Sequence, residues 1–454
     1  MDVSGKRVLV IGFGVLGSGL HAAVLLKRKG AYVTANDIKK KEDLDPKTIK
    51  ALEDMGIPAR WGMAADGLAG DCDLIVTSPA VPLSLPFAKT AREKNIPVIS
   101  ELELASRYCP RPILAITGTN GKTTTTTLTG EMLKTADIPV TVAGNIGVPF
   151  SGQAEGMDPA GWAVVEVSSF QLEGVDTFHP RISAILNITP DHLDRHGTFE
   201  AYMACKARIY QHAGDDDRVV LNADDPHTRA MGEKAPGRVV YFSRREVLTE
   251  GAWVRDGDII LNTGDGNERV CPVSDIFIPG AHNLENALAS ALLARLAGAD
   301  AGAIAATLKD FKGVAHRIEF VRALNGVKYF NDSKGTNPAA AIPAVRAMDG
   351  PTVLIAGGYD KHADFAEWVD TFPGNISALI LMGATADEIE KTVRARAPEI
   401  PVIRAAGLDE AVREAYEKAV PGGNVLLSPA CASWGMFRDY EQRGDLFKQY
   451  VLDL

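Results

Sequence analysis

The sequence predicts an α/β protein in which three successive units alternate β-strands with α-helices. Short apolar runs of strand type recur along the chain, and most of them stop in polar or glycine-rich loops, as the strands of parallel sheets do. Two of these loops, at 12–17 and at 117–123, carry glycine patterns that bind the phosphate groups of nucleotides. The first prediction is therefore an α/β protein that uses a nucleotide.

The loop at 117–123 has the features of a nucleoside triphosphate site. Ile113–Ile116 is an apolar strand, and helical spacing begins after Lys122, so strand, loop and helix follow one another. In such a loop the backbone N–H groups point at phosphate, Lys122 adds a positive charge, and Thr123 offers a hydroxyl to Mg²⁺. Two residues separate Gly118 from Gly121 where four are usual, and the alternative is a simple turn before a lysine. The flanking strand and helix favour the triphosphate site.

The loop at 12–17 reads Gly-Phe-Gly-Val-Leu-Gly and follows the predicted strand Arg7–Ile11. A second strand, Tyr32–Asn36, ends at Asp37, which matches a dinucleotide-binding fingerprint and on its own suggests NAD. Two alternatives stay open at this point. The crevice could hold another diphosphate nucleotide, such as a UDP-linked substrate, or the glycines could serve only close packing.

Two features of the middle unit suggest a site at the carboxyl ends of its strands. Glu166 interrupts the apolar strand Trp162–Val167, where a carboxylate is costly unless a cation or hydrogen bonds hold it. A metal is the leading explanation, and an exposed edge strand is the alternative. The next strand, Ile182–Asn187, leads into a loop that carries the ionisable residues Asp191, His192, Asp194 and His196. Parallel sheets place their ligands at this end of the strands.

Other stretches are less informative. Phe199–Tyr210 is predicted to be a helix, on which Lys206 is interpreted as a solvated lysine. Asn283 and Asn286 are three residues apart on another predicted helix, where they could read a base edge together or cap the helix. The segment Tyr241–Val273 predicts β-hairpins peripheral to the sheet.

The third unit has a polar loop at Asp332–Asn337, after the predicted strand Lys328–Asn331. The loop offers a carboxylate, an ammonium group and further polar side chains, which is more than a plain connection needs, so we favour a site here. The other strands predicted in this unit are Thr352–Ala356, Ala378–Met382 and Asn424–Leu427.

Composition restricts the classes of function. The formal net charge of −10 over 454 residues argues against a nucleic-acid partner. The five cysteines form no CxxC pair, which suits a reducing compartment and buried thiols. No leader pattern and no apolar run of membrane-spanning length is present in the sequence. We therefore expect a cytoplasmic protein with no membrane association.

The motifs together resemble those of the Mur ligases, the ATP-dependent amide-bond-forming enzymes of peptidoglycan precursor synthesis. The resemblance covers essentially the whole chain. Within the family, the motifs are most similar to those of members that join D-glutamate to UDP-N-acetylmuramoyl-L-alanine. It implies a three-domain architecture: a Rossmann-like domain at 1–109, a central P-loop ATPase-type α/β domain at 110–313, and a C-terminal Rossmann-like α/β domain at 314–454. The motifs, in family order, are Thr117–Thr125, Glu166–Leu172, Asp191–Arg195, His282–Asn286, His316–Glu319, Asn331–Asn337, Ser428–Ser433 and Glu441–Gly444.

The resemblance also implies ligands for individual residues. The UDP-sugar would contact Gly14, Val15, Leu16, Asp37, Ser78, Ala80, Asn145 and His192. ATP would contact Gly118, Thr119, Asn120, Gly121, Lys122, Thr123, Thr124, Asn283, Asn286, Arg317, Asp332 and Lys334. The incoming amino acid would contact Thr336, Lys361, Ser433, Trp434 and Tyr440.

The same resemblance implies the metal and catalytic groups. Two Mg²⁺ ions would be held through Thr123, Glu166, His192 and Lys206, and the catalytic residues would be Lys122, His192 and Lys206. In the family the lysine that matches Lys206 reacts with CO₂ to form an anionic carbamate. The implied reaction is phosphorylation of the UDP-N-acetylmuramoyl-L-alanine carboxylate by ATP, followed by attack of the D-glutamate amine, in a monomeric enzyme. The alternatives are a related Mur or folylpolyglutamate-type ligase with another amino acid, and an NAD-dependent oxidoreductase.

Overall fold

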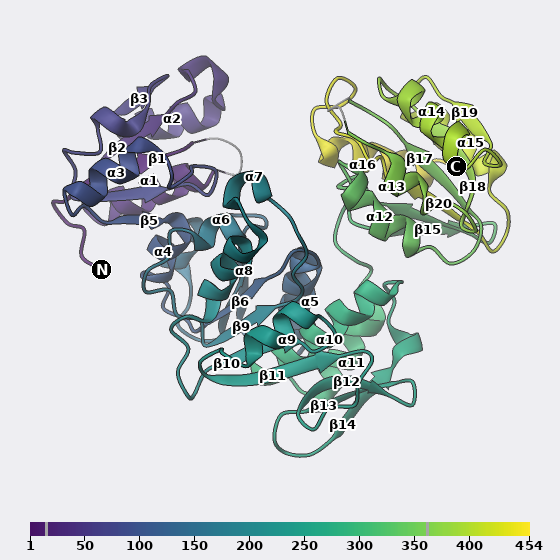
Figure 1. Cartoon of the computed structure of the whole chain (residues 1–454), viewed down its shortest axis with the longest axis horizontal. Coiled ribbons are helices and arrows are strands. Elements are labelled where there is room, and N and C mark those ends of the chain that lie inside the picture. Colours follow the sequence, from purple (N-terminus) through teal and green to yellow (C-terminus); the bar gives the residue numbers. More distant parts are fainter. Residues whose placement is uncertain (14–16, 360–362) are drawn as a thin grey trace. The chain divides into compact units, whose positions relative to one another are not determined.

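The computed structural model describes residues 1–13, 17–359 and 363–454, and its chain divides into two compact units. One unit comprises Met1–Asp275 with Glu285–Lys309, and the other comprises Ile276–Leu284 with Asp310–Leu454. Three separate sheets (Figure 1) confirm the α/β prediction, and the predicted site residues Gly14, Val15, Leu16 and Lys361 lie outside the described residues.

The first sheet is parallel, with the strand order β3-β2-β1-β4-β5. The direction of strand order reverses between β1 and β4, which places a ligand crevice at their carboxyl ends. Its strands are β1 (Arg7–Ile11), β2 (Tyr32–Asp37), β3 (Ala59–Trp61), β4 (Leu74–Thr77) and β5 (Val98–Ser100). Its helices are α1 (Ser18–Arg28), α2 (Pro46–Asp54) and α3 (Pro86–Glu93), with short 3₁₀ turns at Lys41–Asp43 and Ala65–Gly67.

The second sheet has nine strands in the order β14-β13-β12-β11-β10-β9-β6-β8-β7. Its strands from β7 to β12 run parallel, and β13 and β14 add antiparallel pairs to the same sheet. The segment after β11 forms β-hairpins, as predicted: β12–β13 and β13–β14 pair antiparallel, and they extend one edge of the main sheet because β12 pairs with β11. The strands are β6 (Ile113–Thr117), β7 (Val140–Gly144), β8 (Trp162–Glu166), β9 (Ile182–Ile185), β10 (Arg218–Asn222), β11 (Arg238–Ser243), β12 (Gly251–Arg255), β13 (Asp258–Asn262) and β14 (Glu268–Pro272).

The helices between and after these strands include a long one that follows the phosphate loop and several short ones. The α-helices are α4 (Glu101–Ser106), α5 (Lys122–Thr135), α6 (Ser169–Leu172), α7 (Leu193–His196), α8 (Phe199–Ala207), α9 (Pro226–Gly232), α10 (Ala281–Leu296) and α11 (Ala301–Asp310). The 3₁₀ helices are η3 (Phe150–Gly152), η4 (Ala154–Gly156), η5 (Arg208–Tyr210) and η6 (Val273–Asp275).

The third sheet has six strands in the order β15-β16-β20-β17-β18-β19, and only β15 is antiparallel to its neighbour. Its strands are β15 (Glu319–Leu324), β16 (Val327–Asn331), β17 (Thr352–Ala356), β18 (Ile376–Leu381), β19 (Val402–Arg404) and β20 (Asn424–Leu427). Its helices are α12 (Pro338–Arg346), α13 (Ala366–Val369), α14 (Ala386–Arg396), α15 (Leu408–Lys418) and α16 (Tyr440–Leu452).

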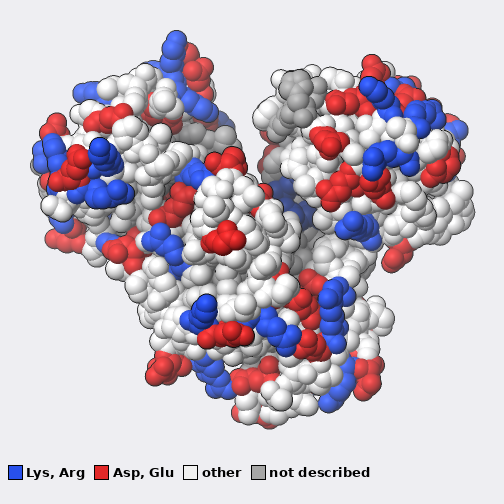
Figure 2. Space-filling model, in the orientation of Figure 1, with Lys and Arg blue, Asp and Glu red and all other residues white. Residues whose placement is uncertain are grey.

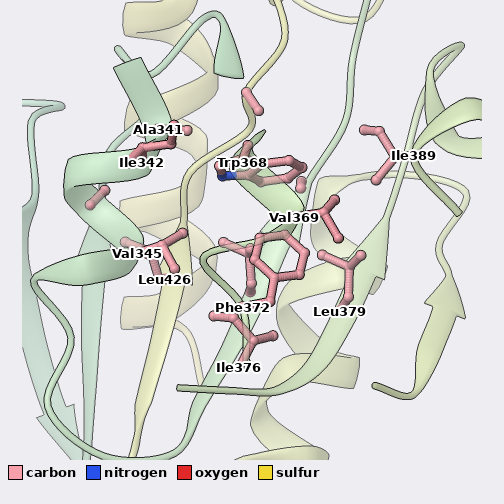
Figure 3. Close-up of a cluster of buried hydrophobic side chains, with 14 of the residues drawn as sticks. Ala341, Ile342, Val345, Trp368, Val369, Phe372, Ile376, Leu379, Ile389 and Leu426 are labelled. Atoms are coloured by element: carbon pink, nitrogen blue, oxygen red, sulfur yellow. The ribbon is translucent and has the colours of Figure 1, made fainter. Parts of the chain in front are cut away.

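Aromatic side chains fill one face of the third sheet. Trp368 and Phe372 are fully buried, and their rings meet edge-to-face with centroids 4.7 Å apart. Figure 3 shows them packed among Ile342, Val345 and Leu379. Such a core fixes the strand ends that carry the polar loops of this sheet.

The surface carries both signs of charge. Figure 2 shows Lys and Arg side chains interspersed with Asp and Glu over the visible face. Among the described residues, no helix is long and apolar enough to cross a lipid bilayer.

Candidate active site

The phosphate loop lies between β6 and α5, as predicted. Gly121 has φ +84°, and a Cβ atom there would come within 2.2 Å of Asn286 Oδ1, so only glycine fits. The loop is held from the side by Asn187, which accepts the Thr119 N–H at its carbonyl (2.9 Å) and the Asn120 N–H at Oδ1 (2.8 Å). The α5 helix begins at Lys122, so its first N–H groups face this loop.

Two lysine side chains meet at one carbonyl of this loop. Lys122 Nζ donates to the carbonyl oxygens of Gly118 and Thr119, both at 2.8 Å. Lys206 Nζ donates to the same Gly118 carbonyl at 2.9 Å and to Thr117 Oγ1 at 3.3 Å. Two ammonium groups at one carbonyl repel each other, so this loop is built to hold negative charge.

Lys206 is not the solvated lysine that the helix pattern predicted. Its residue is 1% exposed, and its Nζ lies 4.8 Å from the centre of the Tyr202 ring. Burial, followed by the charge of Lys122, lowers the pKa of Lys206 to about 7. The tertiary fold brings α8 against the end of β6, which the sequence of α8 alone does not reveal.

Glu166 is a buried carboxylate at the end of β8. The strand lies between β6 and β7 inside the sheet, so the edge-strand alternative was wrong. Glu166 Oε1 accepts a hydrogen bond from Asn145 Nδ2 at 2.9 Å, whereas Oε2 is buried without a hydrogen-bond partner among the described residues. An oxygen left in this state fits a cation.

The described residues contain no group of three or more His, Cys, Asp and Glu side chains that could hold a metal ion by themselves. Mg²⁺ commonly uses one or two protein carboxylates together with the phosphate oxygens of its substrate. Glu166 and the buried hydroxyl residue Thr123 at the phosphate loop suit that kind of site.

A cavity of about 370 Å³ joins the phosphate loop to the first sheet. It brings together six residues that the resemblance assigned to ligands, from segments far apart in sequence: Ser78, Ala80, Lys122, Asn145, His192 and Lys206. The remaining wall includes Glu101, Phe170, Gln171 and Tyr202, which sequence reasoning did not select.

His192 is the N-cap residue of α7, with a positive φ of +52°, and its ring packs at a tilt against Phe170, with ring centroids 4.8 Å apart. Arg195 lies over the same Phe170 ring at 4.9 Å and pairs with Glu173 at 2.6 Å. The Arg195 guanidinium also donates to three successive carbonyls, those of residues 79–81, at 3.2–3.4 Å. Arg195 therefore ties the His192 loop to the loop after β4, and sequence reasoning missed it.

A second cavity of about 380 Å³ lies at the carboxyl ends of the first sheet. Its wall includes Gly12, Asp37, Ser78 and Ala80 beside apolar side chains such as Phe87. Asp37 accepts the Phe13 N–H at 2.6 Å and the Lys39 N–H at 2.9 Å, so its carboxylate is held by the backbone at the crevice.

The polar loop after β16 is built around two buried charges. Asp332 accepts Ser428 Oγ at 2.7 Å and the Ile318 N–H at 3.3 Å, and burial raises the pKa of Asp332 to about 7. Arg443, which is fully buried, donates to the Ser333 carbonyl at 2.8 Å and to the Cys431 carbonyl at 3.1 Å. Arg443 therefore joins the loops after β16 and β20, a role that sequence reasoning missed.

The other predicted residues of this unit surround the same loops. Lys334 Nζ lies 5.7 Å from the centre of the Tyr440 ring, and Ser433 is buried. Trp434 is 54% exposed and packs against Tyr359. Thr336 is half-buried at the start of α12.

The remaining ATP candidates are Arg317, Asn283, Asn286 and Thr124, which lie on different segments of the chain. Arg317 has a buried Nε that makes no hydrogen bond among the described residues. On α10, Asn283 donates to the Pro279 carbonyl at 2.7 Å, and Asn286 Oδ1 accepts from Thr125 Oγ1 at 3.4 Å. Each amide thus has a local structural contact. Thr124 is buried in the first turn of α5.

Comparisons with known proteins agree along the whole chain. Residues 116–294 match the Mur ligase middle domain, and residues 316–431 match the Mur ligase, glutamate ligase domain. The chain is 49% identical over 455 residues to the UDP-N-acetylmuramoylalanine–D-glutamate ligase of Thermoanaerobacter sp. (strain X514), with 100% of both chains covered. It is 46% identical to the enzyme of that name from Pelotomaculum thermopropionicum, with 100% of this chain and 99% of the relative covered.

Solved structures of lower sequence identity share the fold. UDP-N-acetylmuramate-alanine ligase MurC from Thermotoga maritima aligns with a TM-score of 0.59 at 19% identity, covering 99% of each chain. MurF ligase from Thermotoga maritima, solved in complex with ADP, aligns with a TM-score of 0.58 at 18% identity, covering 100% of this chain and 96% of the other. The family domains and the full-length relatives establish that the chain belongs to the Mur ligase family.

Proposed function

We propose that this protein is the ATP-dependent ligase that adds D-glutamate to UDP-N-acetylmuramoyl-L-alanine in peptidoglycan precursor synthesis for the cell wall. Full-length relatives with 44–49% identity carry the name of this enzyme. The structural observation that carries the proposal is the 370 Å³ cavity, in which Lys122 of the phosphate loop and Ser78 of the first sheet share one space. A ligase of this kind needs the γ-phosphate and the substrate carboxylate side by side.

The chemistry begins with transfer of the γ-phosphoryl group to the alanine carboxylate, which gives an acyl phosphate. The D-glutamate amine then attacks the acyl carbon, and phosphate leaves as the amide forms. A free carboxylate is a poor electrophile because oxide would have to leave, and phosphorylation supplies a leaving group. The protein's contribution is positioning and charge compensation, with Lys122 at the β- and γ-phosphates.

We assign the metal positions to Thr123, Glu166, His192 and Lys206. The buried and unpartnered Glu166 Oε2 supports a cation at the end of β8. Mg²⁺ would supply neutralisation of phosphate charge when it is bound. Asn145 holds the other Glu166 oxygen and so fixes the direction in which the carboxylate points.

We further propose that Lys206 is carbamylated. Only a neutral amine reacts with CO₂, and an ordinary lysine is neutral in only about one molecule in 2,500 at pH 7. Burial that lowers the pKa of Lys206 to about 7 raises this fraction to roughly half. A carbamate would replace one of the two ammonium groups at the Gly118 carbonyl by an anion and would explain how a lysine serves beside a metal ion.

We assign the remaining roles by domain. The domain at 1–109 would hold the UDP-sugar, the domain at 110–313 would hold ATP, and the domain at 314–454 would hold D-glutamate and part of the ATP. The second cavity, beside Asp37 and Ser78, suits a nucleotide base at the usual site of a Rossmann-like sheet. We also propose that the enzyme is cytoplasmic and monomeric, in keeping with its five free cysteines.

The proposal is tested by phosphate release from ATP in the presence of UDP-N-acetylmuramoyl-L-alanine and one amino acid at a time. We expect release with D-glutamate and at least about a hundredfold less with L-glutamate, L-lysine or meso-diaminopimelate. Omission of the UDP-sugar is the control and should abolish release. Comparable phosphate release with another amino acid would identify a related ligase with a different amino-acid substrate. Binding of NADH in place of the UDP-sugar would favour an oxidoreductase.

Arg195 provides a separate prediction. Replacing Arg195 by Met removes the donors to the carbonyls of residues 79–81, so the loop that lines both cavities loses its support. We expect the KM for UDP-N-acetylmuramoyl-L-alanine to rise about tenfold, the effect of one or two lost charge-assisted hydrogen bonds. The KM for ATP should change less than about twofold, as measured by steady-state phosphate release.

The matched control is Arg229→Met, which removes an exposed bidentate pair with Glu246 instead. That variant should keep both KM values, because exposed ion pairs contribute little. Equal changes of both KM values in Arg195→Met would contradict a role confined to the UDP-sugar loop.

A further inference from the structure

Glu101 is a buried acid in the wall of the 370 Å³ cavity that the proposed mechanism does not use. It is the first residue of α4, whose N-terminus is capped by Ser100, and it is 1% exposed. The helix packs against η3, so the Glu101 side chain meets the backbone of that turn. The acid therefore has a fixed position between α4, η3 and the cavity.

Only one of the two carboxyl oxygens is satisfied by the protein. Glu101 Oε1 accepts the Ser151 N–H at 2.7 Å. Glu101 Oε2 is buried and has no hydrogen-bond partner among the described residues. Burial raises the pKa of Glu101, and the hydrogen bonds from Ser151 oppose that shift only in part.

Glu103, two residues further along the same helix, shows what a purely structural buried acid looks like here. Its carboxylate accepts the N–H groups of Asp176 and Thr177, the Thr177 hydroxyl and the Arg107 guanidinium. These contacts lower the pKa of Glu103 although burial alone would raise it. Glu103 thus has a complete set of protein donors, and Glu101 does not.

An unsatisfied buried carboxyl oxygen destabilises the folded protein unless a ligand supplies a donor. Capping of α4 does not explain an acid at position 101, because Ser100 already caps the helix through its hydroxyl. The position of Glu101 in the cavity wall provides the missing explanation. A bound molecule can bring a hydrogen-bond donor to Oε2.

We infer that Glu101 binds an uncharged hydrogen-bond donor, a hydroxyl or amide N–H, on the N-acetylmuramoyl sugar of the substrate. This inference rests on the proposed function. An acid repels the diphosphate and the alanine carboxylate, which belong near positive groups, and the ammonium group of Lys122 in this cavity lies at the phosphate loop. The sugar is the uncharged part of the same molecule and carries several O–H and N–H donors.

The test compares the binding of two ligands by calorimetry without ATP: UDP, and UDP-N-acetylmuramoyl-L-alanine. The variants are Glu101→Gln and Glu101→Ala. In Glu101→Gln the amide oxygen accepts the Ser151 N–H. The amide NH₂ group then replaces Oε2, so a hydrogen-bond donor stands where the wild-type side chain has an acceptor. We expect both variants to bind the UDP-sugar about tenfold more weakly, the effect of one lost hydrogen bond to a charged acceptor, and to bind UDP within about twofold of wild type.

The matched control is Glu103→Gln, which should lower the melting temperature through its lost contacts and leave both dissociation constants unchanged. Equal weakening of UDP and the UDP-sugar in the Glu101 variants would overturn the inference, and so would unchanged binding of both. Failure of the wild-type protein to bind the UDP-sugar would instead overturn the proposed function, so the two failures are distinguishable.

Discussion

The Lys122→Ala variant should lose ATP-driven ligation by about a thousandfold or more, roughly 4 kcal/mol of transition-state stabilisation. Lys122 is the first residue of α5, and its ammonium group already lies at the carbonyls of the loop that would hold the phosphates. Charge builds up on the γ-phosphoryl oxygens during transfer, and alanine provides nothing to compensate it. The measurement is phosphate release with all three substrates present.

The fold should survive this change. The Lys122 side chain donates to the carbonyls of Gly118 and Thr119 in its own loop, and the strand before that loop, β6, is held on both sides by β8 and β9. The matched control is Lys134→Ala, on the same helix, where the lysine is exposed and pairs with Glu131. Both variants should melt near the wild-type temperature. Ligation close to wild type by Lys122→Ala would contradict the role of the phosphate loop.

The phosphate loop was predictable because its signal is local. The strand, the glycines that need a positive φ and the lysine that begins the helix all lie within about ten residues of sequence. Glu166 was selected for a related reason, since an acid inside an apolar strand is costly on any fold. Its burial and its unpartnered oxygen agree with that reasoning.

The residues that were missed or misread depend on packing between distant segments. Lys206 has an ordinary helix context, and only the position of α8 against β6 buries it. Arg195 and Arg443 are surface-type residues by sequence, yet each holds two loops that are about a hundred positions apart. Single-sequence patterns do not encode such contacts.

The missed strands have a simpler cause. β3 and β19 are three residues long and lie at sheet edges, so they show little periodicity. β15 mixes charged and apolar residues, and it pairs antiparallel at the edge of the third sheet. Edge strands need less apolar surface than central strands, so the hydrophobic pattern that identifies a strand in the sequence is weak there.

The Lys206→Ala variant should lose about a hundredfold to a thousandfold in ligation, and added short-chain carboxylates should restore part of it. The reason is that a carbamate at Lys206 acts as an anion, and formate or acetate can occupy the space that the shortened side chain leaves beside Thr117 and Tyr202. The measurement is phosphate release at increasing carboxylate concentration and constant ionic strength. Lys122→Ala serves as a control that carboxylates should not rescue.

Alkylammonium salts distinguish an anionic carbamate at Lys206 from a positively charged ammonium group. If Lys206 acts as an ammonium group, methylammonium would restore the variant and acetate would inhibit it further. We favour the anion because a second ammonium at the Gly118 carbonyl would repel Lys122, and the charge of Asp191 offsets that repulsion only in part. Conversion of that amine to an anion turns the repulsion into attraction. Rescue by methylammonium would contradict carbamylation and assign Lys206 the role of an ammonium group. Absence of rescue by any carboxylate would also contradict carbamylation.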